Sequence, residues 1–69
     1  MNVYAIMTGL VLNLLVKQGE QVKSGQDVIV LESMKMEIPI QAPESGTVKE
    51  IKVNPGDFVN EGDLLLVLE

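Results

Sequence analysis

The 69-residue chain contains neither cysteine nor histidine, and these two absences remove many of the side chains that enzymes use. Without cysteine, the chain has no disulfide framework and no thiolate metal site. Without histidine, it lacks the commonest general base and the commonest metal ligand. A serine or cysteine nucleophile activated by histidine is therefore excluded. We expect a protein that is not itself a catalyst.

Positive charge is also scarce. Arginine is absent and five lysines face ten acidic residues, which gives a formal charge of −5. Nucleic acid binding needs a basic surface that neutralises phosphates, and an acidic surface disfavours anionic lipid. The apolar stretch at residues 3–16 is too short to cross a bilayer, and it lacks the basic start and the cleavage site of a signal peptide. We expect a cytoplasmic protein that binds neither nucleic acid nor membrane.

The chain repeats itself when it is shifted by 37 positions. Residues 3–32 align without a gap with residues 40–69, and ten of the thirty aligned positions are identical. One repeat of this size is too small to bury its own apolar face, whereas two repeats can cover each other. We therefore predict one domain over residues 1–69, with repeat halves 3–32 and 40–69 and a linking hairpin at 33–39.

Each half has the pattern of short β-strands, because valine, isoleucine and leucine are dense and glycines interrupt them at short intervals. No stretch free of glycine and proline shows helical periodicity. The predicted fold is all-β, a flattened antiparallel barrel or sandwich of two four-stranded sheets with quasi-twofold symmetry. Strands are expected near residues 2–7, 10–16, 21–23, 27–33, 36–41, 47–53, 58–60 and 64–68.

The linking hairpin is the segment that the repeat does not explain. The twofold axis places it at the opposite end of the molecule from the chain termini. A two-residue turn of type I′ needs a positive φ at both central positions and favours Asn-Gly, whereas here the tip is Met34-Lys35. Residues that disfavour the expected turn geometry, when they lie on a protruding loop, indicate a functional role. In the alternative interpretation, the lysine is a solvated charge that protects a sheet edge and the methionines fill the core.

The hairpin sequence Glu32-Ser33-Met34-Lys35-Met36-Glu37 resembles the biotin attachment motif of biotin carboxyl carrier proteins, in which a Met-Lys-Met core carries the modified lysine. Residues 42–48 and 54–63 resemble the same family, so the likeness extends along the whole chain. It implies the biotinyl/lipoyl-carrier fold of the hammerhead type. Because the two halves align without a gap, we expect the small type without an additional thumb loop, either as a free-standing carrier or as a domain of a longer chain. The acceptor lysine of this fold lies on the hairpin between the two halves.

The resemblance assigns roles to five residues of the hairpin. Lys35 is the acceptor of covalent biotin, and Met34 and Met36 flank it as recognition residues. Glu32 and Glu37 are candidates for recognition by the ligase. Glu32 has a competing explanation, because its repeat counterpart at the end of the chain has no such role. The resemblance implies no catalytic residue and no metal site.

By this resemblance, the protein is a non-catalytic carrier subunit or domain of a biotin-dependent carboxylase. A biotin protein ligase loads Lys35, and the biotin then moves a carboxyl group from a biotin carboxylase to a carboxyltransferase. We expect the isolated domain to be monomeric. The alternative is a lipoyl carrier of a 2-oxoacid dehydrogenase-like system, or an acceptor of both biotin and lipoate, because the fold and the lysine position are shared. Lipoyl domains usually contain Asp-Lys-Ala, so the two methionines favour biotin.

Three leucines distinguish the first half from the second. Leu10, Leu12 and Leu15 align with Thr47, Lys49 and Lys52, which are expected to face solvent. We see two alternatives for them. The leucines form an exposed patch on which an enzyme subunit or a second copy docks, or they turn inward in an asymmetric core.

Overall fold

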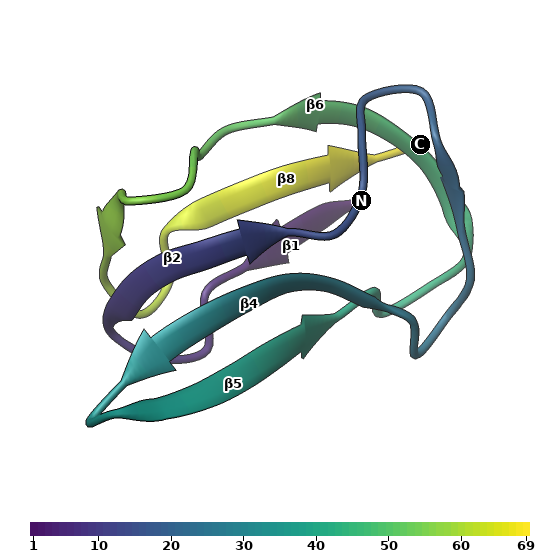
Figure 1. Cartoon of the computed structure of the whole chain (residues 1–69). Helices are drawn as coiled ribbons and strands as arrows, with labels where there is room; N and C mark the ends of the chain where they lie inside the picture. Colours follow the sequence, from purple (N-terminus) through teal and green to yellow (C-terminus); the bar gives the residue numbers. More distant parts are fainter.

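The computed structural model describes all of residues 1–69 and consists of eight β-strands without a helix (Figure 1). The strands are β1 (Asn2–Tyr4), β2 (Gly9–Leu14), β3 (Gln21–Val22), β4 (Asp27–Ser33), β5 (Met36–Gln41), β6 (Gly46–Ile51), β7 (Phe58–Val59) and β8 (Leu64–Leu68). They form two four-stranded sheets in the orders β1-β8-β6-β3 and β5-β4-β2-β7, and every pairing is antiparallel. The predicted all-β fold class is confirmed. No helix has the length and apolar character needed to cross a bilayer.

The 37-residue shift in the sequence corresponds to the symmetry between the two sheets. It carries the sheet order β1-β8-β6-β3 onto β5-β4-β2-β7, including the bulges in the strand pairings. Hydrogen bonds between the halves are duplicated as well. The Val11 N–H donates to the Asp57 carbonyl at 2.8 Å, and its counterpart Val48 N–H donates to the Glu20 carbonyl at 2.9 Å. Each half therefore supplies backbone partners to the other.

The core lies between the two sheets and is entirely apolar. Sixteen hydrophobic residues are buried, and no polar or charged residue is buried with them. The core residues are Val3, Ala5, Val11, Val16, Val22, Val28, Ile29, Leu31, Ile40, Ala42, Val48, Val53, Val59, Leu65, Leu66 and Leu68. Leu10, Leu12 and Leu15 lie outside this cluster. The alternative in which these leucines turn into the core is therefore wrong.

The first strand is shorter than the sequence predicts. It was expected over residues 2–7 but ends at Tyr4. The backbone of Ala5 instead bonds to the following turn, because its N–H donates to the Asp63 carbonyl at 2.9 Å and its carbonyl accepts from the Gly62 N–H at 2.9 Å. The strands expected at 10–16 and 47–53 begin one residue earlier and end two residues earlier. The chain leaves both ladders as it enters a tight turn.

Four of the tight turns share one construction. Each contains a glycine with φ between 85° and 95°, followed by an acidic or amide side chain. The Asp57 carboxylate, for example, accepts from the Asn54 N–H at 2.8 Å, and the Asp63 carboxylate accepts from the Asn60 N–H at 2.8 Å. Much of the family-like segment 54–63 therefore encodes turns. Glycine fits there because it adopts a positive φ without steric cost.

The β4–β5 turn departs from this construction. Ser33 pairs with Met36, which leaves Met34 and Lys35 as a two-residue turn with φ values of 52° and 64°. These are the only residues other than glycine with a positive φ. A positive φ at both central positions is the type I′ geometry that the sequence predicts for this hairpin. A residue with a Cβ in this left-handed region costs about 1–2 kcal/mol.

We expect the substitution Met34→Asn together with Lys35→Gly to raise the free energy of unfolding by about 1–2 kcal/mol, chiefly because glycine removes the left-handed strain at position 35. Urea unfolding followed by circular dichroism measures this difference. Lys35→Arg keeps a Cβ and a charge at the same φ, so it serves as the neutral control. Equal or lower stability of the Asn-Gly variant would contradict the strain.

Candidate functional site

The β4–β5 hairpin holds the predicted site residues at a protruding tip. Met34 is 92% exposed and Met36 is 64% exposed, and Lys35 between them is exposed as well. Lys35 takes part in neither of the two salt bridges, and its amine makes no hydrogen bond within the chain. The methionines at the tip are not core filler, and the amine is accessible to a reagent or an enzyme.

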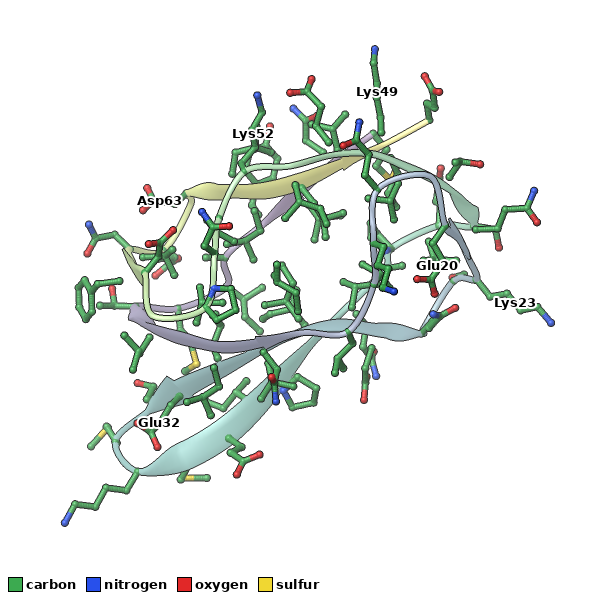
Figure 2. The ribbon with its side chains drawn as sticks, turned by 45° about the horizontal axis from the view of Figure 1, so that its top comes forward. Glu20, Lys23, Glu32, Lys49, Lys52 and Asp63 are labelled. Atoms are coloured by element: carbon green, nitrogen blue, oxygen red, sulfur yellow. The ribbon has the colours of Figure 1, made fainter.

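The two acidic residues of the motif lie opposite each other on β4 and β5. Glu32 and Glu37 are register partners and both are exposed. Like charges directly opposite one another on a sheet are destabilising, and neither carboxylate forms a salt bridge within the chain. Figure 2 shows Glu32 beside the β4–β5 turn, away from Lys49 and Lys52. The pair forms a small acidic surface next to Lys35.

The backbone of Glu32 has a structural role that its repeat counterpart shares. A Cβ at Gly9 would lie 2.7 Å from the Glu32 carbonyl oxygen, and a Cβ at Gly46 would lie 2.9 Å from the Glu69 carbonyl oxygen. Both glycines therefore permit the close approach of neighbouring strands. The two glutamate side chains differ, because Glu69 lies 4.0 Å from the Lys49 amine whereas Glu32 has no such partner. The repeat explains the Glu32 backbone but leaves its carboxylate unexplained.

The hairpin tip and the chain termini lie at opposite ends of the molecule (Figure 1). The Met1 ammonium group donates to the Leu68 carbonyl, and the Thr47 N–H donates to the Glu69 carbonyl at 2.8 Å, so β1, β6 and β8 hold both ends together. The tip is thus free of the rest of the chain. This is the position that the repeat symmetry predicts.

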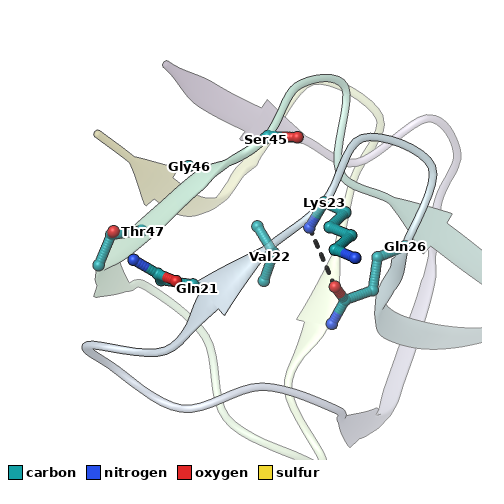
Figure 3. Close-up of a pocket in the computed structure, with 7 residues that line it drawn as sticks. All are labelled: Gln21, Val22, Lys23, Gln26, Ser45, Gly46 and Thr47. Atoms are coloured by element: carbon teal, nitrogen blue, oxygen red, sulfur yellow. Dashed lines mark hydrogen bonds between the residues drawn. The ribbon is translucent and has the colours of Figure 1, made fainter.

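A pocket lies between β3 and β6 and the segments next to them (Figure 3). Its lining residues are Gln21, Val22, Lys23, Gln26, Ser45, Gly46 and Thr47. Val22 is the one hydrophobic residue among them, and the Lys23 N–H donates to the Gln26 side-chain oxygen at 3.0 Å. The pocket adjoins Glu69 through Thr47. It therefore lies near the chain termini, at the end of the molecule opposite Lys35.

The remaining charged groups include two exposed salt bridges. No cluster of three metal-ligating side chains is present. The Lys52 amine, 2.7 Å from the Glu50 carboxylate, lowers the pKa of Glu50 through a hydrogen bond and its charge. This pair is exposed on the sheet that does not carry the hairpin. What the site offers chemically is one accessible primary amine between two methionines.

Known proteins are similar to this chain in both sequence and fold. Residues 3–68 match the biotin/lipoyl family, described as biotin-requiring enzyme. A biotin/lipoyl attachment protein of Bacillus subtilis is 57% identical over 68 residues, which cover 99% of this chain and 93% of the relative. The biotin carboxyl carrier protein of acetyl-CoA carboxylase from Solanum lycopersicum is 45% identical over 67 residues, 97% of this chain and 96% of the relative.

A solved structure gives the same result for the fold. The urea carboxylase of Kluyveromyces lactis matches 100% of this chain with a TM-score of 0.95 and 35% sequence identity, although the match covers only 6% of the carboxylase. The chain thus corresponds in length to small attachment and carrier proteins, and to a small part of a large carboxylase. With the family match over nearly all of its residues, the chain belongs to the biotin/lipoyl attachment family.

Proposed function

We propose that this protein is a biotin carboxyl carrier in which Lys35 carries covalent biotin, and that residues 1–69 form one attachment domain with the modified hairpin between its halves. The observation that carries the proposal is the β4–β5 turn. Four other turns place glycine at positive φ, whereas this turn places Met34 and Lys35 there. Selection for stability alone would favour Asn-Gly at such a turn. The methionine and the lysine are retained for what they present to solvent.

Loading of Lys35 requires a separate biotin protein ligase. The lysine nitrogen attacks the acyl carbon of biotinyl-adenylate, an amide bond forms, the acyl–phosphate bond breaks, and AMP leaves while the amine loses a proton. The chain has no histidine that could accept this proton, so the ligase supplies the base. The contribution of the carrier is an unpaired amine on a protruding turn, where an enzyme can surround it from several sides.

The residues around Lys35 serve recognition in this proposal. Met34 and Met36 present flexible, polarizable side chains, which adapt to the surfaces of more than one enzyme. Glu32 and Glu37 place two carboxylates on one face of the hairpin, where they suit a partner with basic side chains. None of these residues acts on the reacting atoms.

The carrier then serves a biotin carboxylase and a carboxyltransferase without being a catalyst. Bound biotin supplies the nitrogen that carries the carboxyl group. The domain supplies reach and a high effective concentration at each active site. The names of the similar proteins support this role, since one is the biotin carboxyl carrier protein of acetyl-CoA carboxylase and another is a urea carboxylase.

A lipoyl carrier is the second candidate function. The observation in its favour is the name of the Bacillus subtilis relative, a biotin/lipoyl attachment protein that is 57% identical to this chain. The fold and an exposed hairpin lysine suit both cofactors. The methionines on both sides of Lys35, in place of Asp and Ala, favour biotin.

Co-expression with a biotin protein ligase is expected to add one biotin per chain, and Lys35→Arg is expected to abolish the adduct. The four other lysines serve as internal controls for nonspecific acylation, because they are exposed but do not lie on the hairpin. Intact mass spectrometry of the wild type and of the variant measures both results. An unmodified wild type, or an adduct that survives the substitution, would refute the proposal.

The identity of the flanking residues is expected to determine which ligase accepts the hairpin. Met34→Asp with Met36→Ala converts the tip to the lipoyl pattern, and we expect it to slow biotin loading at least about tenfold, on the scale of losing a good recognition contact. A parallel reaction with a lipoate ligase should show a gain of lipoyl adduct. Conservative Met34→Leu with Met36→Leu is the control for side-chain size. If wild type takes lipoate faster than biotin, the second candidate function is correct.

A further inference from the structure

The outer surfaces of the two sheets differ in a way that the fold does not require. On the β5-β4-β2-β7 sheet, Leu10 is the register partner of Glu32 on β4 and of Phe58 on β7. Val11 and Leu14 face the core, so alternation along the strand turns Leu10 and Leu15 outward. Leu12 lies at the bulge and also stays outside the core cluster. We refer to Leu10, Leu12, Leu15 and Phe58 as the apolar face.

The apolar face is accessible to solvent. Phe58 is 66% exposed and Leu15 is 47% exposed, while Leu10 and Leu12 are half-buried. Single exposed apolar residues are ordinary on protein surfaces, but a contiguous group marks a binding surface more often. Folding alone would account for this group only if the sheet required apolar side chains at these positions.

The second half of the chain builds the equivalent strands with different residues, so it shows whether the sheet requires apolar side chains there. The positions equivalent to Leu10, Leu12, Leu15 and Phe58 are Thr47, Lys49, Lys52 and Gln21. The equivalent strand pairings have the same register. The fold therefore forms with polar or charged side chains at all four positions. The stability of the sheet does not explain why the first half carries three leucines and a phenylalanine there.

The difference between the two halves also changes the surroundings of Glu32. In the second half, the Lys49 amine lies 4.0 Å from the Glu69 carboxylate. The equivalent pair in the first half is Leu12 and Glu32, so the lysine that would pair with the glutamate is replaced by an apolar side chain. Glu32 also lies in the row that joins Glu37, Leu10 and Phe58 across the sheet. The apolar face thus has an unpaired acidic border on the side of the hairpin.

We propose that the apolar face, with Glu32 and Glu37 at its border, is the docking surface for the ligase that modifies Lys35; this rests on the proposed function. The surface that fits it is apolar at its centre and has lysine or arginine opposite the two glutamates. A second copy fits less well, since each chain carries a charge of −5 and two copies would repel each other. Charge complementarity therefore selects a basic partner.

The position of Lys35 identifies this partner as the ligase. Glu32 precedes Lys35 by three residues and Glu37 follows it by two, and both belong to the row that continues into Leu10 and Phe58. An enzyme that acts on the bare amine must reach to within one lysine side chain of the turn. It therefore covers the adjoining surface. An enzyme that acts on the loaded cofactor can stand farther away.

Exchanging residues between the two halves tests this proposal. Leu12→Lys with Leu15→Lys places on β2 the lysines that β6 and its extension already carry, so the variant should fold. We expect KM for biotin loading by a purified biotin protein ligase to rise about tenfold with kcat unchanged, because the substitution removes binding and leaves the reacting groups in place. Phe58→Gln, which copies Gln21, is expected to raise KM in the same direction without adding charge.

The control is the reverse exchange, Lys49→Leu with Lys52→Leu on the other sheet, which should leave KM unchanged. Circular dichroism and thermal unfolding show whether each variant is folded. An unchanged KM in both first-half variants would overturn the proposal. So would sedimentation of the wild type as a dimer that Leu12→Lys with Leu15→Lys dissociates, since the face would then bind a second copy. A wild type that no biotin ligase loads would overturn the proposed function itself.

Discussion

The structure depends on the mutual burial of the apolar faces of its two sheets. Each sheet takes its two central strands from one half and its two edge strands from the other, and its apolar face is covered by the equivalent face of the second sheet. The hydrogen bonds between the halves follow the same rule, because Val11 bonds to Asp57 while Val48 bonds to Glu20. A chain of this size has little apolar area to bury. Because the chain is duplicated, two equivalent apolar sheet faces contribute to one core.

This constraint makes the symmetry of the molecule informative. Residues that both halves share are explained by folding, such as Gly9 and Gly46 at close strand contacts or Gly19 and Gly56 at turns. Residues that lie outside the core and differ in chemistry between equivalent positions are free of that demand. The segment 33–39, which holds the β4–β5 turn, has no counterpart within the repeat, and Leu12 stands where the second half has Lys49. Comparison of the halves therefore separates structural residues from candidates for binding.

Much of the fold is predictable from the sequence because its cause is visible in the sequence. The repeat, the glycine-marked turns and the density of β-branched residues predict eight strands in two sheets, and the structure contains them. The strand ends are less predictable. Whether residues 5–7 continue β1 depends on the Ala5 backbone bonding to Asp63 and Gly62 instead of a strand, and those residues are almost sixty positions away in the sequence.

The site, like the fold, is predictable from the sequence only in part. The position of Lys35 near the hairpin tip follows from the segment that the repeat leaves over, and the structure places it on a two-residue turn with φ of 64°. The opposition of Glu32 and Glu37 follows once that turn is known. The row that links them to Leu10 and Phe58 could not be read from the sequence, because it requires the pairing of β2 with both β4 and β7. Cross-strand neighbours depend on register, and register depends on the whole sheet.

The turn and the duplicated core are connected through stability. Natural domains are stable by only about 5–15 kcal/mol, and a chain of 69 residues belongs at the low end. Two left-handed residues with side chains at the tip cost about 1–2 kcal/mol each, a considerable part of that total. The cost is tolerated because the turn lies beyond the last core layer, where Leu31 and Ile40 are buried but residues 34–37 are exposed. Strain at the tip is thus separated from the packing that holds the sheets together, and the chain can present Met34, Lys35 and Met36 without loosening its core.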